Sequence, residues 1–132
     1  MKLTRATDYA IRLLSYLAAD GKENTSVEIA KALNIPFNHL SKLVHQLGRQ
    51  GYLVTRKGKG GGIQLAVDPK KASLIDVIEL IEGPMSMSEC ILNLGCCENS
   101  KTCKFRKKLS GAQALMREAL SKSTISDLVL RK

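Results

Sequence analysis

A run of glycines and lysines near the middle of the chain, residues 57–62, restricts the fold more than any other feature of the sequence. β-rich residues 52–56 precede this run, and residues 63–67, which alternate apolar and polar side chains, follow it. Two such segments joined by a glycine-containing turn are typical of a two-stranded hairpin. The sequence therefore predicts one hairpin with a basic, glycine-rich tip.

Apolar side chains on both sides of the hairpin recur at three- and four-residue spacings, which predicts helices. Thr4 suits the N-cap of the first helix. Thr25 and Glu28 have the spacing of a capping box, and Pro36 suits the first turn of a helix. The predicted helices cover about residues 4–19, 25–33, 36–50, 73–82 and 104–121.

These elements, in this order, predict a mainly α-helical fold with a small β-hairpin wing, which is a winged helix-turn-helix followed by a long C-terminal helix. A chain of 132 residues fits one compact domain with an appended element. We expect three parts: residues 1–83 as the winged helix-turn-helix, residues 84–104 as a cysteine-rich loop, and residues 105–132 as the long helix and C-terminal tail.

The third predicted helix must bury one face and can offer its polar face to the major groove of DNA. No Asp or Glu lies between Pro36 and Val67, and the chain carries a formal charge of +9. A solvated helix face and a flexible hairpin tip are the plainer interpretations, but the order of helix, turn, helix and basic wing favours DNA binding. The candidate DNA contacts are Asn38, His39, Ser41, Lys42, His45, Gln46 and Arg49 on the helix, and Arg56, Lys57 and Lys59 on the wing.

All four cysteines fall within residues 90–103, as Cys90, Cys96, Cys97 and Cys103. Their spacing differs from the paired Cys-x-x-Cys pattern of structural zinc sites. A loop with wider gaps can wrap a larger object, and thiolates are the usual ligands of iron–sulfur clusters. A redox switch made of thiols alone, or inert cysteines, are the alternatives. Cys96 and Cys97 are adjacent, so one of them is expected to be spare.

The beginning of the chain leads directly into an amphipathic helix without a charged-then-apolar signal segment, and no stretch is apolar enough to span a bilayer. We therefore expect a cytoplasmic protein without a membrane partner. In that reducing compartment cysteines serve more often as metal ligands or redox sensors than in disulfides.

Several motifs spread over nearly the whole chain resemble one known family. These motifs are residues 3–10 (LTRATDYA), 29–36 (IAKALNIP), 40–43 (LSKL), 51–54 (GYLV) and the glycines at 60–62, together with the late cysteines. The chain resembles the Rrf-two family of winged helix-turn-helix transcription regulators. In its ligand pattern it is most similar to the members that act as nitric-oxide-sensitive iron–sulfur repressors, and it is related to those that regulate iron–sulfur clusters.

This resemblance implies a homodimer that binds palindromic double-stranded DNA and holds a 4Fe-4S or 2Fe-2S cluster. The family's cysteine triad would fall on Cys90, Cys97 and Cys103, with Cys96 as the alternative middle ligand. Asp8 matches a fourth ligand that the partner subunit contributes, although an acid in the first turn of a helix also has a purely structural use. The long late helix would form the dimer through Leu109, Ala112, Leu115, Met116 and Ala119.

The resulting prediction is a non-enzymatic transcription repressor whose DNA affinity is controlled by a cluster that senses nitric oxide, redox or iron–sulfur status. One alternative is a repressor of the same family without a cluster, controlled by thiol chemistry or by a partner protein. A small iron–sulfur electron carrier is the second alternative, and the basic helix face argues against it.

Overall fold

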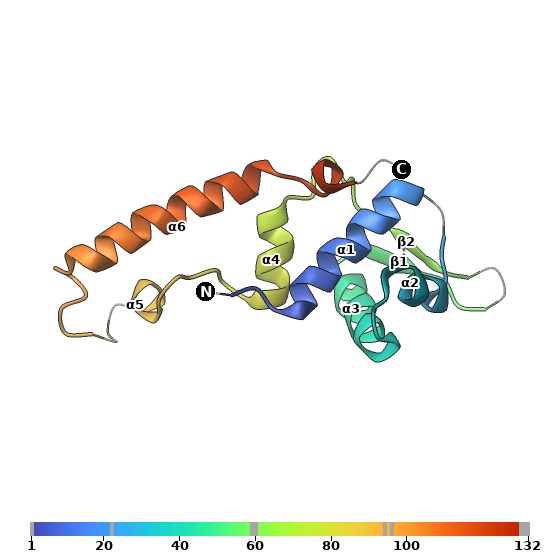
Figure 1. Cartoon of the computed structure of the whole chain (residues 1–132), viewed down its shortest axis with the longest axis horizontal. Helices are drawn as coiled ribbons and strands as arrows, with labels where there is room; N and C mark the ends of the chain where they lie inside the picture. Colours follow the sequence, from blue (N-terminus) through green and yellow to red (C-terminus); the bar gives the residue numbers. More distant parts are fainter. Residues whose placement is uncertain (1, 22, 59–60, 94, 96, 130–132) are drawn as a thin grey trace.

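The structure is a computed structural model that describes residues 2–21, 23–58, 61–93, 95 and 97–129. Helices predominate over a single two-stranded hairpin in this part of the chain (Figure 1). The elements are α1 (Arg5–Asp20), α2 (Ser26–Leu33), α3 (Phe37–Arg49), β1 (Leu53–Thr55), β2 (Ile63–Leu65), α4 (Leu74–Glu82), α5 (Glu89–Leu92), α6 (Lys104–Lys122) and the 3-10 helix η2 (Ile125–Leu128). The predicted mainly α-helical fold with a β-hairpin wing is confirmed.

Local capping signals account for the start of α2. The Glu28 N–H donates to Thr25 Oγ1 at 3.2 Å, and the Thr25 N–H donates to Glu28 Oε2 at 3.0 Å. This is the predicted capping box, in which two helix-end donors are satisfied reciprocally. Thr4 likewise occupies the N-cap position of α1, but its side chain does not cap the helix. Its hydroxyl instead donates to Glu82 Oε1, at 2.7 Å.

The hairpin is antiparallel, with Leu53 opposite Leu65, and its strands are shorter than the β-rich segments of the sequence. The connection between α1 and α2 extends the hairpin, because the Ile63 N–H donates to the Asn24 carbonyl at 2.7 Å. A Cβ atom on Gly62 would lie 2.9 Å from that same carbonyl oxygen. The wing therefore needs a glycine at residue 62 for its own packing.

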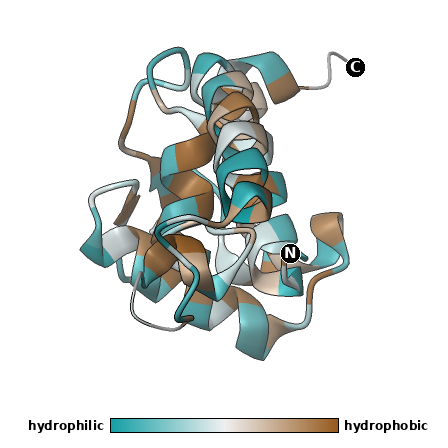
Figure 2. Cartoon of the chain, turned by 90° about the vertical axis from the view of Figure 1, so that its left-hand side faces the viewer, coloured by the Kyte–Doolittle hydropathy of each residue, from teal (hydrophilic) through white to brown (hydrophobic). Residues whose placement is uncertain are grey.

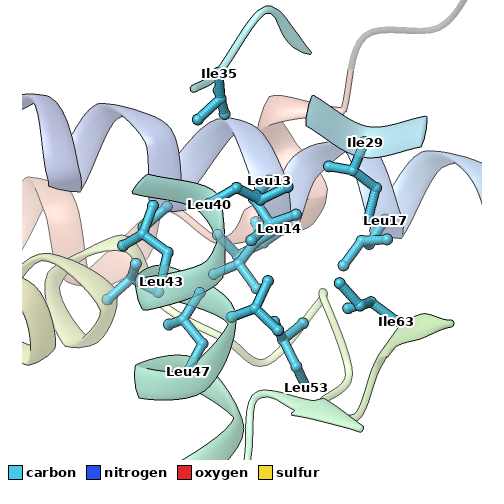
Figure 3. Packing of buried hydrophobic residues seen from close by; sticks show 14 of the residues in the cluster. Leu13, Leu14, Leu17, Ile29, Ile35, Leu40, Leu43, Leu47, Leu53 and Ile63 are labelled. Atoms are coloured by element: carbon cyan, nitrogen blue, oxygen red, sulfur yellow. The ribbon is translucent and has the colours of Figure 1, made fainter. Parts of the chain in front are cut away.

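One hydrophobic core joins α1, α2, α3 and the hairpin, and Figure 3 shows its side chains converging between these elements. The apolar face of α3 lies against α1, which leaves the polar face of α3 turned outward. Fully buried side chains in this core include Leu13 and Leu14 of α1, Ile29 of α2, and Leu40 and Leu47 of α3. We call residues 5–65 the reading head.

The last described residues return to the same core. Ile125 of η2 is fully buried, and its N–H donates to the Ala72 carbonyl at 3.0 Å. The Leu74 N–H donates to the Ser123 carbonyl at 2.9 Å. The far end of α6 is thereby fastened to the start of α4 and to α1.

The segment that carries the cysteines extends away from the reading head together with the first part of α6 (Figure 1). We call residues 86–113 the cysteine arm; Figure 2 faces the side from which it projects and shows polar and apolar residues along its ribbon. The sequence predicted a loop here, but α5 forms one helical turn because Ser88 Oγ caps the Cys90 N–H at 3.3 Å. Among the described residues, none of the helices combines the length and the apolar character that crossing a membrane requires.

Candidate functional site

The outward face of α3 carries the polar side chains that the sequence singled out. Ser41 is half-buried and the others on this helix are exposed: Asn38, His39, Lys42, His45, Gln46 and Arg49. Leu40, Leu43, Val44 and Leu47 anchor the opposite face in the core. Since the first turn of α3 contains no acidic residue and none follows in the helix, this face presents only neutral and basic groups to a polyanion.

A cavity of about 440 Å³ lies beside this face, between α2, α3 and β1. Ser41, His45 and Arg49 line it together with two residues that the sequence analysis did not select, Ser26 and Thr55. Ser26 begins α2, the helix whose counterpart in helix-turn-helix proteins crosses the DNA backbone. Its position directly after the Thr25 cap was the sequence signal that could have identified it.

The wing carries Arg56 and Lys57, both exposed, whereas Lys59 lies outside the described residues. Arg56 Nε is 3.4 Å from Glu23 Oε1. A phosphate that binds Arg56 would therefore compete with a carboxylate that belongs to the protein. A Cβ atom on Gly61 would lie 2.4 Å from the Arg56 carbonyl oxygen, so the turn also requires a glycine there.

Two polar side chains on α3 already have contacts within the chain. The His39 ring lies 6.0 Å from the ring of Tyr9, centroid to centroid, and the two planes are tilted by 59°. Gln46 Nε2 donates to the carbonyl oxygen of Leu80 in α4 at 3.4 Å. These contacts tie the polar face of α3 to α1 and to α4.

The first turn of α1 presents Asp8 at the surface, where Arg12 Nη1 lies 3.6 Å from its carboxylate. Buried Thr7, in the same turn, donates from Oγ1 to Glu82 Oε1 at 2.5 Å, and the Thr4 N–H donates to the same oxygen at 2.7 Å. These hydrogen bonds, above all the one from Thr7, hold the pKa of Glu82 below its ordinary value. The end of α4 is therefore hydrogen-bonded to the start of α1.

Arg106 joins two of the cysteines. Its Nε donates to the Cys90 carbonyl at 2.9 Å, and its backbone N–H donates to Cys103 Sγ at 3.4 Å. Cys90 and Cys103 are half-buried, and Ser88 Oγ lies 2.7 Å from Cys90 Sγ. Cys97 is exposed, and Cys96 lies outside the described residues.

The described residues contain no group of three His, Cys, Asp or Glu side chains placed to share a metal ion. The structure thus brings Cys90 and Cys103 to one arginine. Among the described residues, it does not bring Cys97 or Asp8 together with Cys90 and Cys103 into a group that could share a metal ion.

The long helix α6 leaves much of its apolar surface uncovered. Ala112, Leu115 and Ala119 are exposed, while Leu109 and Met116 are half-buried. Met116 packs within its own chain against a small cluster formed by Ile75, Ile78 and Met85. Leu115 is 70% exposed, whereas the other two large side chains among the five predicted dimer contacts, Leu109 and Met116, are half-buried.

Known proteins resemble this chain over nearly its whole length. The family model Rrf2 (Rrf-two), described as an iron-dependent transcriptional regulator, matches residues 3–131. The HTH-type transcriptional regulator NsrR of Bacillus subtilis (strain 168) is 37% identical over 135 residues, covering 100% of this chain and 92% of that protein. The NsrR of Geobacillus kaustophilus is also 37% identical, over 98% of this chain and 90% of its own length.

Solved structures agree on the fold. CymR, the global cysteine regulator of B. subtilis, aligns with a TM-score of 0.75 at 24% identity, over 98% of this chain and 96% of its own. IscR of T. potens aligns with a TM-score of 0.76 at 18% identity, over 97% of this chain and 85% of its own. The predicted winged helix-turn-helix fold and the predicted regulatory, non-enzymatic class agree with these relatives. The chain is a DNA-binding transcription regulator and belongs to the Rrf2 family of iron-dependent transcriptional regulators.

Proposed function

We propose that this regulator is a homodimeric repressor whose affinity for its operator is controlled by an iron–sulfur cluster that senses nitric oxide. One observation carries the proposal: α4 packs against α1 of the reading head and against α6, whose N-cap is Cys103 and whose first part belongs to the cysteine arm. A change at the cysteines therefore has a short path of packed helices to the DNA-reading surface. Coupling between two sites in proteins typically changes affinity by roughly 5- to 150-fold.

The DNA side of the proposal uses α3 and the wing. α3 enters the major groove with Asn38, Ser41, His45 and Arg49 toward base edges and phosphates, while Arg56 and Lys57 hold the flanking backbone. Ser26 and Thr55 join them, because they line the same cavity beside α3. His39, Lys42 and Lys59 complete the proposed contacts.

The chemistry of the donor set suits a thiolate-held cluster. Three described thiols, on Cys90, Cys97 and Cys103, lie outside the hydrophobic core and are half-buried or exposed, so a soft metal could reach them. We assign these three as ligands and Asp8 of the partner subunit as the fourth, with Cys96 as the alternative middle ligand. When bound, a 4Fe-4S or 2Fe-2S cluster would supply iron that reacts with nitric oxide.

Asp8 has to exchange partners to serve as a ligand. In this structure its carboxylate faces Arg12 of its own helix, 3.6 Å away, and both side chains are accessible to solvent. A surface ion pair of this kind is worth roughly 0–1 kcal/mol, so giving it up costs little. Withdrawal of Asp8 would move the start of α1, and α1 packs against α3.

The proposed dimer forms along α6 through Leu109, Ala112, Leu115, Met116 and Ala119. A two-fold axis between two such helices presents two reading heads, which explains a palindromic operator. We retain residues 1–83 as the DNA-binding part, 84–104 as the sensor segment, and 105–132 as the dimerisation helix and tail. As a transcription regulator the protein would work in the cytoplasm.

Purification without oxygen tests the central claim. The protein should be coloured, contain iron and sulfide, and bind one operator tightly, and nitric oxide should weaken that binding by at least about fivefold. The comparison uses the same preparation before and after nitric oxide, with bovine serum albumin treated identically as a control for the reagent. Equal affinity of loaded and stripped protein for every DNA would end the proposal.

Ligand variants test the assignment. Cys97→Ala should lose the visible absorbance, whereas the neighbouring Cys96→Ala should keep it. Asp8→Ala should speed the decay of the absorbance in air, because the fourth ligand is lost. The opposite result for the two cysteines would move the middle ligand to Cys96, and an unchanged decay rate would return Asp8 to a role in the first turn of α1.

A regulator controlled by thiol chemistry alone is the second candidate. The exposure of Cys97 and the lack of a converged metal group among the described residues favour it. It predicts colourless, iron-free protein whose DNA binding responds to peroxide and recovers with a thiol reductant. A colourless protein whose DNA binding responds neither to peroxide nor to the reductant would indicate control by a partner protein. A coloured protein without any DNA sequence preference would indicate an electron carrier.

A further inference from the structure

The last turn of α4 contains a carbonyl oxygen that its own helix cannot satisfy. A helical carbonyl accepts from the N–H four residues later, and the Glu79 carbonyl does so from Gly83 at 2.9 Å. For the Leu80 carbonyl the residue four positions on is Pro84, which has no N–H. The Leu80 carbonyl therefore needs a donor from elsewhere or from water.

Gln46 of α3 supplies that donor. Its Nε2 donates to the Leu80 oxygen at 3.4 Å, across 34 residues of sequence. A side-chain amide on the recognition helix thus completes the hydrogen bonding of α4. The hydrogen bonding at the C-terminal end of α4 therefore depends on where α3 lies relative to α4.

The same turn of α4 also holds two other helices. Glu82 Oε1 accepts from Thr4 and Thr7 at the start of α1, and the Glu79 carboxylate forms an ion pair with Arg117 of α6. The chain continues from Gly83 directly toward Cys90. Within the described part of the chain, residues 79–82 thus make polar contacts with α1, α3 and α6 at the root of the cysteine arm.

We propose that residues 79–82 form the junction through which the cysteine arm sets the position of α3, and that Gln46 is a positioning residue of this junction rather than a reader of bases. The inference rests on the proposed function, since it assumes that the state of the arm changes DNA affinity. Movement at the root of the arm shifts the Leu80 carbonyl. Because Gln46 is hydrogen-bonded to that carbonyl, the recognition helix α3 moves as well.

Three substitutions separate positioning from base reading. Gln46→Met keeps the length of the side chain but removes the donor, whereas Gln46→Lys keeps a donor that can reach the Leu80 carbonyl. Gln50→Met makes the same chemical change at an exposed glutamine just after α3. The measured quantity is the ratio of operator affinities of cluster-loaded and cluster-free protein, in which the effect of an added charge on both forms cancels.

Gln46→Met should lower this ratio by roughly two- to tenfold, the worth of one net hydrogen bond. Gln46→Lys should restore most of it, and Gln50→Met should leave it unchanged. Selection from random DNA should return the wild-type operator for all three variants. A changed base preference in Gln46→Met together with an unchanged ratio would overturn the inference, because that is the result expected of a base-reading residue.

A measurement without cluster or DNA checks the junction separately. In cluster-free protein, Gln46→Met should increase amide hydrogen exchange in the second half of α3 and in residues 79–82, and Gln50→Met should not affect residues 79–82. Unchanged exchange at both places would overturn the inference even where the affinity ratio falls. If cluster-loaded and cluster-free wild-type protein bind the operator equally well, the proposed function fails. If their affinities differ and Gln46→Met leaves that difference unchanged, only the role of Gln46 is refuted.

Discussion

The reading head and the cysteine arm are held together in different ways. In the reading head, three leucines of α1 alone are at most 2% exposed, and they pack against α2, α3 and the hairpin. In the arm, Ser100 is the only buried residue among those that the structure describes. A segment with little buried apolar surface cannot offset the entropy of its own ordering. The difference shows that a hydrophobic core, to which α4 and η2 also contribute, holds the head together, while the arm depends on α4, on a bound group or on a second subunit.

The largest expected effect lies in the reading head. Leu13→Ala should lower the free energy of unfolding by about 2–5 kcal/mol, because it leaves a cavity in a fully buried site. Leu92→Ala, at an exposed position in the arm, should change it by no more than about 0.5 kcal/mol. Urea unfolding followed by circular dichroism measures both. Equal losses for the two variants would remove the distinction between head and arm.

The next effect concerns the uncovered face of α6. Leu115→Glu should weaken the proposed dimer at least about tenfold, since burying a leucine is worth about 1.5–3 kcal/mol and a two-fold interface counts it twice. Sedimentation velocity over a range of protein concentrations measures the dissociation constant. Val27→Glu is the matched control, because Val27 is an exposed apolar residue on the reading head, 61% accessible. A dimer that tolerates Leu115→Glu would have to form elsewhere.

Basic residues occur in both regions, but only those of the head should contact DNA. Arg49→Ala should make the dependence of the logarithm of DNA affinity on the logarithm of salt shallower by about 1.8, because each subunit of the proposed dimer loses one phosphate contact and each contact is worth about 0.9. Lys107→Ala, at an exposed position of the arm, should leave this slope unchanged. Fluorescence anisotropy at several salt concentrations measures the slopes. A shallower slope for Lys107→Ala would extend the DNA surface onto the arm.

The smallest effect tests the joint between the two regions. Hydrogen bonds from Thr7 and Thr4 lower the pKa of Glu82 in the folded protein, so Glu82 stabilises the fold above its ordinary pKa of 4.5. That contribution is lost as the pH falls through the lowered pKa. Glu82→Gln should therefore be less stable than wild type near pH 7, and the difference should vanish in acid.

Urea unfolding at several pH values gives this difference directly. Thr7→Val removes the principal donor and should reproduce part of the effect, with the same loss in acid. A stability difference between wild type and Glu82→Gln that stays constant down to about pH 3 would mean that the carboxylate charge plays no part in the joint.

The sequence predicts this structure best where signals act over one helical turn. Thr25 and Glu28, three residues apart, gave the start of α2, and Pro36 marked the start of α3. Ser88, an N-cap residue, carried a comparable local signal for α5, which was missed because the segment lacked apolar periodicity. Thr4 lies at the predicted N-cap position, but its hydroxyl donates to Glu82, which is distant in sequence, and does not cap the helix.

By itself the sequence determined the order of helices and hairpin, the outward polar face of α3, the clustering of the cysteines and the family. These depend on side-chain spacing within a few residues, where the backbone geometry is known in advance. Only the tertiary structure decided that Gln46 bonds to Leu80, that Glu82 holds Thr4 and Thr7, that Arg106 joins Cys90 to Cys103, and that Ile125 lies in the core. Contacts between residues far apart in the chain depend on how whole elements pack, and no local pattern encodes that packing.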